Sequence, residues 1–134
     1  MRKLDNFTRG YIVAALWSTN DESTPEGGEP LDKNYDVEDL ASETLDCIVA
    51  DCEKFQRDNA ADLVLYAEMM RKYDPSQGTI DEYAGHDFWL TRNGHGAGFW
   101  DRGLGDVGDR LTKASKPYGS CDLYVGDDGK VYSN

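Results

Sequence analysis

Residues 85–103 read GHDFWLTRNGHGAGFWDRG and contain both histidines of the chain, two of its three tryptophans and two of its four phenylalanines. The pair Asn93-Gly94 lies at the centre of this stretch. Asn-Gly between apolar runs is the strongest short signal for a β-hairpin. We therefore predict a hairpin with arms at 87–92 and 97–101, and the alternative is a helix that ends at Gly94.

The segments around this stretch carry their own local signals. Residues 79–82, Thr-Ile-Asp-Glu, have the form of a capping box, which predicts that a short helix begins there. Residues 104–118 have helical apolar spacing and predict another helix. Residues 122–132 have strand-favouring arms around a Gly-Asp-Asp-Gly tip, so we predict a second β-hairpin.

The N-terminal half is predicted to be mostly helical. Residues 7–18 have helical spacing with Asn6 as a plausible N-cap. Residues 42–73 predict one long helix, or two nearly collinear helices joined at Asp58-Asn59. Three extra apolar residues predict that its second half is covered on two sides: Val64, Leu65 and Met69.

Between these helices, residues 19–36 are rich in Pro, Gly, Asp and Glu, which cannot sustain a helix or a strand. They predict a long acidic loop, and loops of this length in compact domains are commonly functional. We expect Leu31 and Tyr35 to attach its far end to the body of the protein.

We therefore predict the α+β class, with three to four helices packed on a small antiparallel sheet made of two β-hairpins. At 134 residues the chain has the size of one domain, spanning 1–134, with the acidic loop at about 19–36. The sheet is expected to hold six aromatic residues: Phe88, Trp89, Phe99, Trp100, Tyr124 and Tyr132.

The negative charge is concentrated in one part of the chain. The formal net charge is -12, and residues 19–53 contain twelve acids against Lys33 alone. Direct nucleic-acid binding needs a basic footprint, so this distribution argues against it and favours a partner protein with a basic surface. The predicted partner-binding residues are Asp21, Glu22, Glu26, Glu29, Asp32, Asp36, Glu38 and Asp39. The competing interpretation is that these acids serve solubility and helix N-termini.

Other composition signals limit the location and chemistry. The three cysteines, Cys47, Cys52 and Cys121, form neither a CxxC pair nor a Cys/His metal motif, and the N-terminus does not resemble a signal peptide. We expect a protein of a reducing cytosol without a metal or cofactor. No run of apolar residues is long enough to span a membrane.

Residues 85–103 nevertheless contain candidate ligand-binding side chains. Histidine and aspartate can act as an acid–base pair, and a glycine-containing loop with an arginine can hold a phosphate or carboxylate. The sequence matches neither nucleotide-binding glycine motif, so these glycines can equally serve only turn geometry. The possible ligand-binding residues are His86, Asp87, Arg92, Asn93, His95 and Asp101.

Three sequence stretches resemble a family of small acidic accessory proteins of tailed bacteriophages. They are GHDFWLTRNGHGAGFWD at 85–101, DLYVGDDG at 122–129 and FTRGYI at 7–12. The resemblance implies a phage protein that acts in the cytoplasm of an infected bacterium. It carries over no catalytic residues.

Two functional hypotheses follow. The first is a non-enzymatic accessory protein that binds and modulates a host or phage protein, for example as an acidic nucleic-acid mimic that inhibits a defence or DNA-processing factor. The second is a small-ligand-binding or catalytic module centred on residues 86–102.

Overall fold

The computed structural model describes residues 3–21, 28–71, 79–95 and 97–133. This part of the chain is mostly helical, with five α-helices and two short antiparallel strand pairs, which is consistent with the α+β class. The finer prediction of three or four helices on one sheet of two hairpins is wrong. The two strand pairs form separate sheets, and only the second comes from a predicted hairpin.

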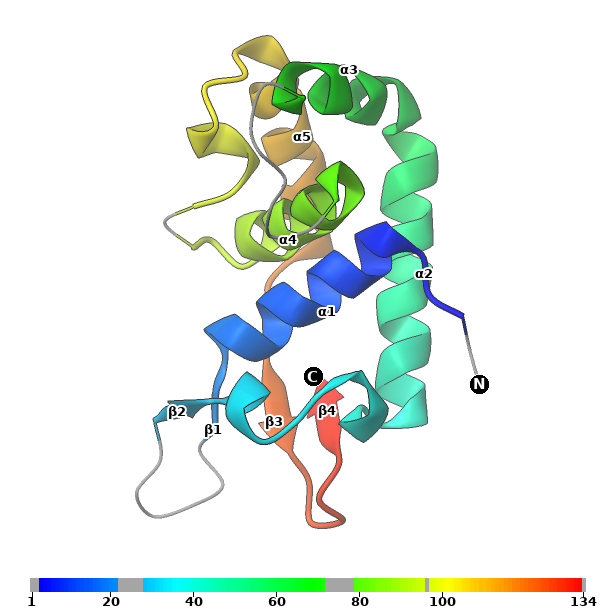
Figure 1. Cartoon of the computed structure of the whole chain (residues 1–134), viewed down its shortest axis with the longest axis vertical. Helices are drawn as coiled ribbons and strands as arrows, with labels where there is room; N and C mark the ends of the chain where they lie inside the picture. Colours follow the sequence, from blue (N-terminus) through cyan, green and yellow to red (C-terminus); the bar gives the residue numbers. More distant parts are fainter. Residues whose placement is uncertain (1–2, 22–27, 72–78, 96, 134) are drawn as a thin grey trace.

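The five helices are α1 (Asn6–Ser18), α2 (Ser42–Asp58), α3 (Ala60–Met70), α4 (Ile80–Arg92) and α5 (Asp106–Ser115). In Figure 1, α1 and α4 lie side by side across the middle of the molecule. Helix α2 runs along one side, and α3 crosses the top to contact α5. The helices therefore pack mainly on one another.

Helix α4 begins where the sequence predicts, and α1 begins one residue earlier than predicted. The N-cap of α1 is Asp5, one residue before the predicted Asn6, and its Oδ1 accepts a hydrogen bond from the Thr8 backbone N–H at 2.8 Å. At α4, Thr79 and Glu82 form the predicted capping box. Each cap satisfies backbone N–H groups that have no partner within the first turn of the helix.

The predicted hairpin around Asn93-Gly94 is wrong, because α4 continues to the residue before this pair. Gly94 has a φ of 70°, its N–H donates to the Thr91 carbonyl, and the His95 N–H donates to the Leu90 carbonyl at 3.0 Å. This pattern is a Schellman motif, which closes a helix with a glycine at positive φ. Asn-Gly suits a hairpin turn for the same conformational reason, so the dipeptide alone does not distinguish the two outcomes.

The predicted second arm of that hairpin is a single 3₁₀ turn, η3 (Phe99–Asp101). It is held against α4 by a hydrogen bond of 3.1 Å from the Phe99 N–H to Oγ1 of Thr91. Four aromatic residues predicted for strands therefore lie in helical segments: Phe88, Trp89, Phe99 and Trp100.

Two glycines set the close approach of α1 and α4. A Cβ added to Gly85 would overlap the backbone carbonyl oxygen of Phe7, and one added to Gly10 would overlap that of Glu82. Only glycine fits at these two positions, and the side chains around them can then interlock. The same crossing places Phe88 of α4 within the aromatic core, where its ring stacks on that of Phe55 with centroids 4.1 Å apart.

Of the two alternatives predicted for residues 42–73, the structure has two helices, α2 and α3, which meet at Asn59 but are not collinear (Figure 1). The Asn59 side chain and backbone N–H both donate to the Phe55 carbonyl, which ends α2. The prediction of two-sided coverage is wrong for Val64 and Leu65, which are 59% and 41% exposed. Helix α3 packs one face on α4 and α5 and leaves these residues on the other.

The C-terminal part follows the sequence prediction closely. The helix predicted at 104–118 is α5 followed by a 3₁₀ turn, η4 (Lys116–Tyr118). The predicted second hairpin is confirmed by the antiparallel pair β3 (Leu123–Val125) and β4 (Val131–Ser133). Alternating apolar residues and a Gly-rich tip were sufficient signals here.

Strand β4 also ties the C-terminal region to the start of α2. The Ala41 N–H donates to the Val131 carbonyl at 2.8 Å, and the Ser133 N–H donates to Oγ1 of Thr44 at 3.1 Å. Leu40 pairs with Val131 in a parallel bridge. The segment before α2 is therefore fixed by residues from the other end of the chain.

The prediction that residues 19–36 form neither helix nor strand is wrong for the described part, which contains β1 (Asn20–Asp21), β2 (Glu29–Pro30) and the 3₁₀ turn η1 (Leu31–Lys33). A second 3₁₀ turn, η2 (Val37–Asp39), follows. Leu31 is 1% exposed and Tyr35 packs partly buried against the core, which confirms both predicted attachments. The segment is thus held in place along its second half.

Candidate functional site

The predicted ligand-binding residue Asp87 is a buried structural carboxylate with no exposed surface. It accepts two hydrogen bonds from Arg102, at 3.0 and 2.8 Å, and one from the Tyr66 hydroxyl at 2.7 Å. Burial and the neighbouring Asp87 raise the pKa of Tyr66, so its hydroxyl remains a donor. Both oxygens of Asp87 are therefore engaged within the fold.

Arg92 is likewise used by the fold. Its side chain is only 6% exposed and donates to the Tyr11 hydroxyl at 3.0 Å and to Asp51 at 2.9 Å. It also donates to the backbone carbonyls of Tyr118 and Gly119, at 2.8 and 2.9 Å. A single guanidinium thus connects α4 with α1, α2 and the turn after η4.

Three further candidates lie at or after the end of α4: Asn93, His95 and Asp101. The Asn93 side chain donates to the Trp89 carbonyl and accepts from the Cys121 N–H at 2.7 Å. His95 is exposed beyond the helix, and Asp101 accepts a hydrogen bond from the backbone at the start of η3. These residues end helices and fix loops.

His86 is half-buried on α4, with its ring centroid 5.9 Å from that of Trp17 on α1. Its Nδ1 is buried and has no hydrogen-bond partner in the described part of the chain. Burial lowers the pKa of His86; the charge of Arg102 acts in the same direction and that of Asp87 opposes it. The folded protein therefore favours neutral His86.

The structure gives three of the six candidates a role in the fold, and it leaves His86 with a buried Nδ1 that has no partner among the described residues. Asp87, Arg92 and Asn93 already have partners in the fold, while His95 and Asp101 follow the end of α4. A site built on two hairpin arms is excluded by the helix that replaces them.

The predicted partner-binding acids differ in what they contact. Asp21 lies in β1, and Glu22 and Glu26 lie outside the described residues. Glu29 forms an exposed ion pair with Lys33 at 2.7 Å. For these four acids, the structure therefore does not identify a carboxylate that is free to bind a partner.

The remaining four acids lie on the 31–39 segment. Asp36 and Asp39 form a reciprocal capping box at η2, each accepting a backbone hydrogen bond at 2.9 Å. Asp32 and Glu38 are exposed, and their carboxylates make no hydrogen bond or ion pair with the described residues. Two carboxylates thus face solvent from a segment that buried Leu31 holds in place.

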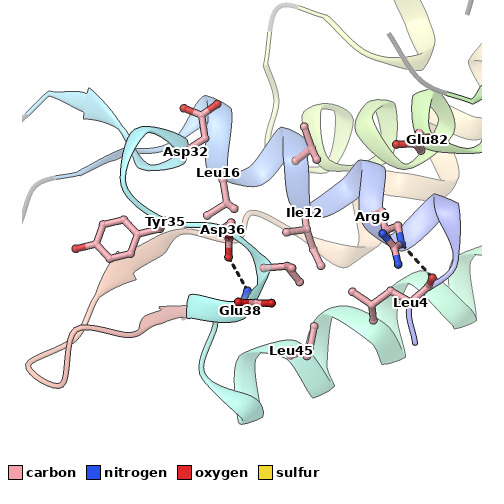
Figure 2. Close-up of a pocket in the computed structure, with 12 residues that line it drawn as sticks. Leu4, Arg9, Ile12, Leu16, Asp32, Tyr35, Asp36, Glu38, Leu45 and Glu82 are labelled. Carbon is pink, nitrogen blue, oxygen red and sulfur yellow. Dashed lines mark hydrogen bonds between the residues drawn. The ribbon is translucent and has the colours of Figure 1, made fainter. Parts of the chain in front are cut away.

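Asp32, Asp36 and Glu38 border a groove of about 690 Å³ between α1, the 31–39 segment and the start of α2. Its floor is apolar and consists of Leu4, Ile12, Val13, Leu16, Val37 and Leu45, with Tyr35 beside them. Figure 2 shows Ile12 and Leu16 pointing from α1 toward this segment, with Leu45 opposite. We call this feature the α1 groove. It is the strongest candidate site in the described structure.

Other kinds of site lack support in the described residues. No group of three or more His, Cys, Asp or Glu side chains there is placed to hold a metal ion. No helix in that part is long and apolar enough to cross a membrane. No protein-family model, curated protein or solved structure matches the chain. The geometry of the α1 groove therefore carries the functional argument.

Sequence reasoning missed both the buried Asp87 cluster and the α1 groove. A helical interpretation of residues 80–92 places Asp87 beside Ala84, Phe88 and Thr91 on one face, which signals a buried carboxylate. The groove has no comparable local signal, because its floor combines residues from three separate segments.

Replacing Arg92 with lysine should lower the free energy of unfolding by about 1–3 kcal/mol. Lysine keeps the charge but cannot reach the same acceptors with a planar fork. Chemical denaturation would measure the change, with Arg57→Lys as the control because Arg57 is 70% exposed. Equal stability of the two variants would contradict the structural role of Arg92.

The free energy of unfolding should decrease as the pH falls below about 6.5, in part because of His86. In that range His86 is protonated more readily in the unfolded chain than in the folded chain, where burial lowers its pKa. The free energy of unfolding therefore rises with pH. His86→Gln should flatten this dependence between pH 7.5 and 5.5, measured by urea denaturation, while His95→Gln keeps it. An unchanged slope in His86→Gln would contradict this account.

Proposed function

We propose that this protein is a non-enzymatic phage accessory protein that binds and modulates a host or phage protein in the infected cell. The carrying observation is that Asp32 and Glu38 present free carboxylates beside an apolar groove, on a segment anchored by Leu31. Such a surface suits a partner with a basic face, because a preorganised acidic patch steers association and selects for positive charge. The net charge of -12 supports the same choice.

Nucleic-acid mimicry is the specific form of modulation that we propose. An acidic protein that occupies a basic nucleic-acid-binding site excludes DNA or RNA from it. A defence or DNA-processing factor of the host would be inhibited in this way. Competition between the protein and duplex DNA for the captured partner tests this form, and simultaneous binding of both would contradict it.

The double variant Asp32→Asn, Glu38→Gln should reduce partner capture from infected-cell lysate by about ten-fold, and higher salt should weaken the wild-type interaction. Neither side chain supports the fold, whereas changes at Asp36 or Asp39 would also disturb the cap of η2. The yield of specifically retained protein, identified by mass spectrometry, is the measurement.

A matched control separates local from general charge effects. Glu53→Gln, Glu68→Gln removes the same charge from exposed positions on α2 and α3, away from the groove. It should retain wild-type capture. Equal capture by both double variants and the wild type would contradict the proposed function.

A further inference from the structure

The α1 groove exposes aliphatic surface that the fold leaves uncovered. Val13 on α1 is 57% exposed and Val37 at η2 is 37% exposed, and both line the groove. Ile12 and Leu16 below them are buried, so the exposed valines continue an apolar floor that is joined to the core. Covering such a floor with another apolar group is favourable, because it removes that surface from water.

The charges at the rim restrict what can cover this floor. Four carboxylates border the groove, those of Asp32, Asp36, Glu38 and Glu82, against the single guanidinium of Arg9. Asp36 and Glu82 accept backbone hydrogen bonds in capping boxes, which leaves their negative charge in place. An anionic ligand is therefore disfavoured, whereas a cationic one gains from the rim.

We propose that the α1 groove binds a basic amphipathic segment of the partner protein, with aliphatic or aromatic side chains on the floor and lysines or arginines at the acidic rim. This inference rests on the proposed function and names the chemistry of the partner. A volume of about 690 Å³ accommodates several side chains, which suits a peptide segment with more than one apolar anchor. A folded basic surface without apolar side chains would contact only the carboxylates at the rim and would leave the apolar floor uncovered.

Three synthetic peptides test the two parts of this proposal. The first carries leucines at i, i+3, i+4 and i+7 and lysines elsewhere. The second replaces the leucines with serines, and the third replaces the lysines with glutamines. Isothermal titration calorimetry should give affinity for the first peptide that exceeds that for each of the others by about ten-fold or more.

Paired protein variants locate the binding. The double variant Val13→Gln, Val37→Gln removes the exposed apolar floor, and its affinity for the first peptide should be about ten-fold lower than that of the wild type. Val64→Gln, Leu65→Gln makes the same kind of change at exposed positions on α3 and should bind as the wild type does. Circular dichroism and thermal melting verify that each variant is folded before its affinity is compared.

The outcomes distinguish this inference from the proposed function. It is overturned if the first peptide does not bind, if the serine or glutamine peptide binds equally well, or if the floor variant binds as the control does. The proposed function survives those results if Asp32→Asn, Glu38→Gln still loses the natural partner. If Asp32→Asn, Glu38→Gln still captures the natural partner, that result would instead contradict the proposed function itself.

Discussion

Replacing Asp87 with alanine should lower the free energy of unfolding by about 3–5 kcal/mol, enough to unfold a large fraction of a marginally stable domain. The carboxylate has no exposed surface and accepts hydrogen bonds from both Arg102 and Tyr66. Its removal leaves a partly buried guanidinium without a counter-charge and a buried hydroxyl without an acceptor. Urea denaturation followed by circular dichroism would measure the loss.

The chain contains a matched control for this substitution. Asp62 also accepts hydrogen bonds from an arginine: Nε of Arg110 donates to both of its oxygens and Nη2 donates to Oδ1, but the side chains of Asp62 and Arg110 are 21% and 51% exposed. Asp62→Ala should therefore cause a much smaller loss, because water and salt can replace the partner. Similar losses at Asp87 and Asp62 would show that burial does not determine the cost.

Gly85→Ala should destabilise the protein by about 3 kcal/mol or more, because the new methyl group would force α1 and α4 apart. In an open helix the same substitution is stabilising by about 1 kcal/mol, since alanine has the higher helix propensity. The sign of the change therefore reports on the contact with the Phe7 carbonyl. Thermal and chemical denaturation would measure it, and Gly10→Ala should behave in the same way.

Gly126→Ala is the control for these two variants. A Cβ there would meet side-chain atoms of Tyr132 and Asp128, which can move, and not a helix backbone. Its effect should be well below that of Gly85→Ala. A stabilised Gly85→Ala protein would contradict the close crossing of α1 and α4.

The parts of the fold that the sequence predicted are those with redundant local signals. Helix α1, the capping box of α4 and the hairpin of β3 and β4 each combine a pattern with a cap or turn. The hairpin prediction for residues 87–101 is wrong because Asn93-Gly94 suits both a hairpin turn and the end of a helix. Packing against α1 decides between these two structures. Gly85, to which sequence reasoning assigned no particular role, is a contact point between α1 and α4.

Prediction of the candidate site was partial for a related reason. The acidic composition of residues 19–53 identified Asp32, Asp36 and Glu38, which border the α1 groove. It could not identify the floor, because Val13 and Val37 line one groove only when α1 packs beside the 31–39 segment. Nor could composition show that Arg92 and Asp87 are used by the fold.

The hydrogen bonds between β4 and residues Ala41 and Thr44 impose an order on folding during synthesis. The residues that join the 31–39 segment to α2 pair with Val131, and the first turn of α2 is bonded to Ser133. A growing chain therefore cannot form these contacts until Ser133 has left the ribosome and the long-range pairing has occurred. If the proposed function holds, a nascent chain in which β4 has not yet paired with the start of α2 should not capture the partner.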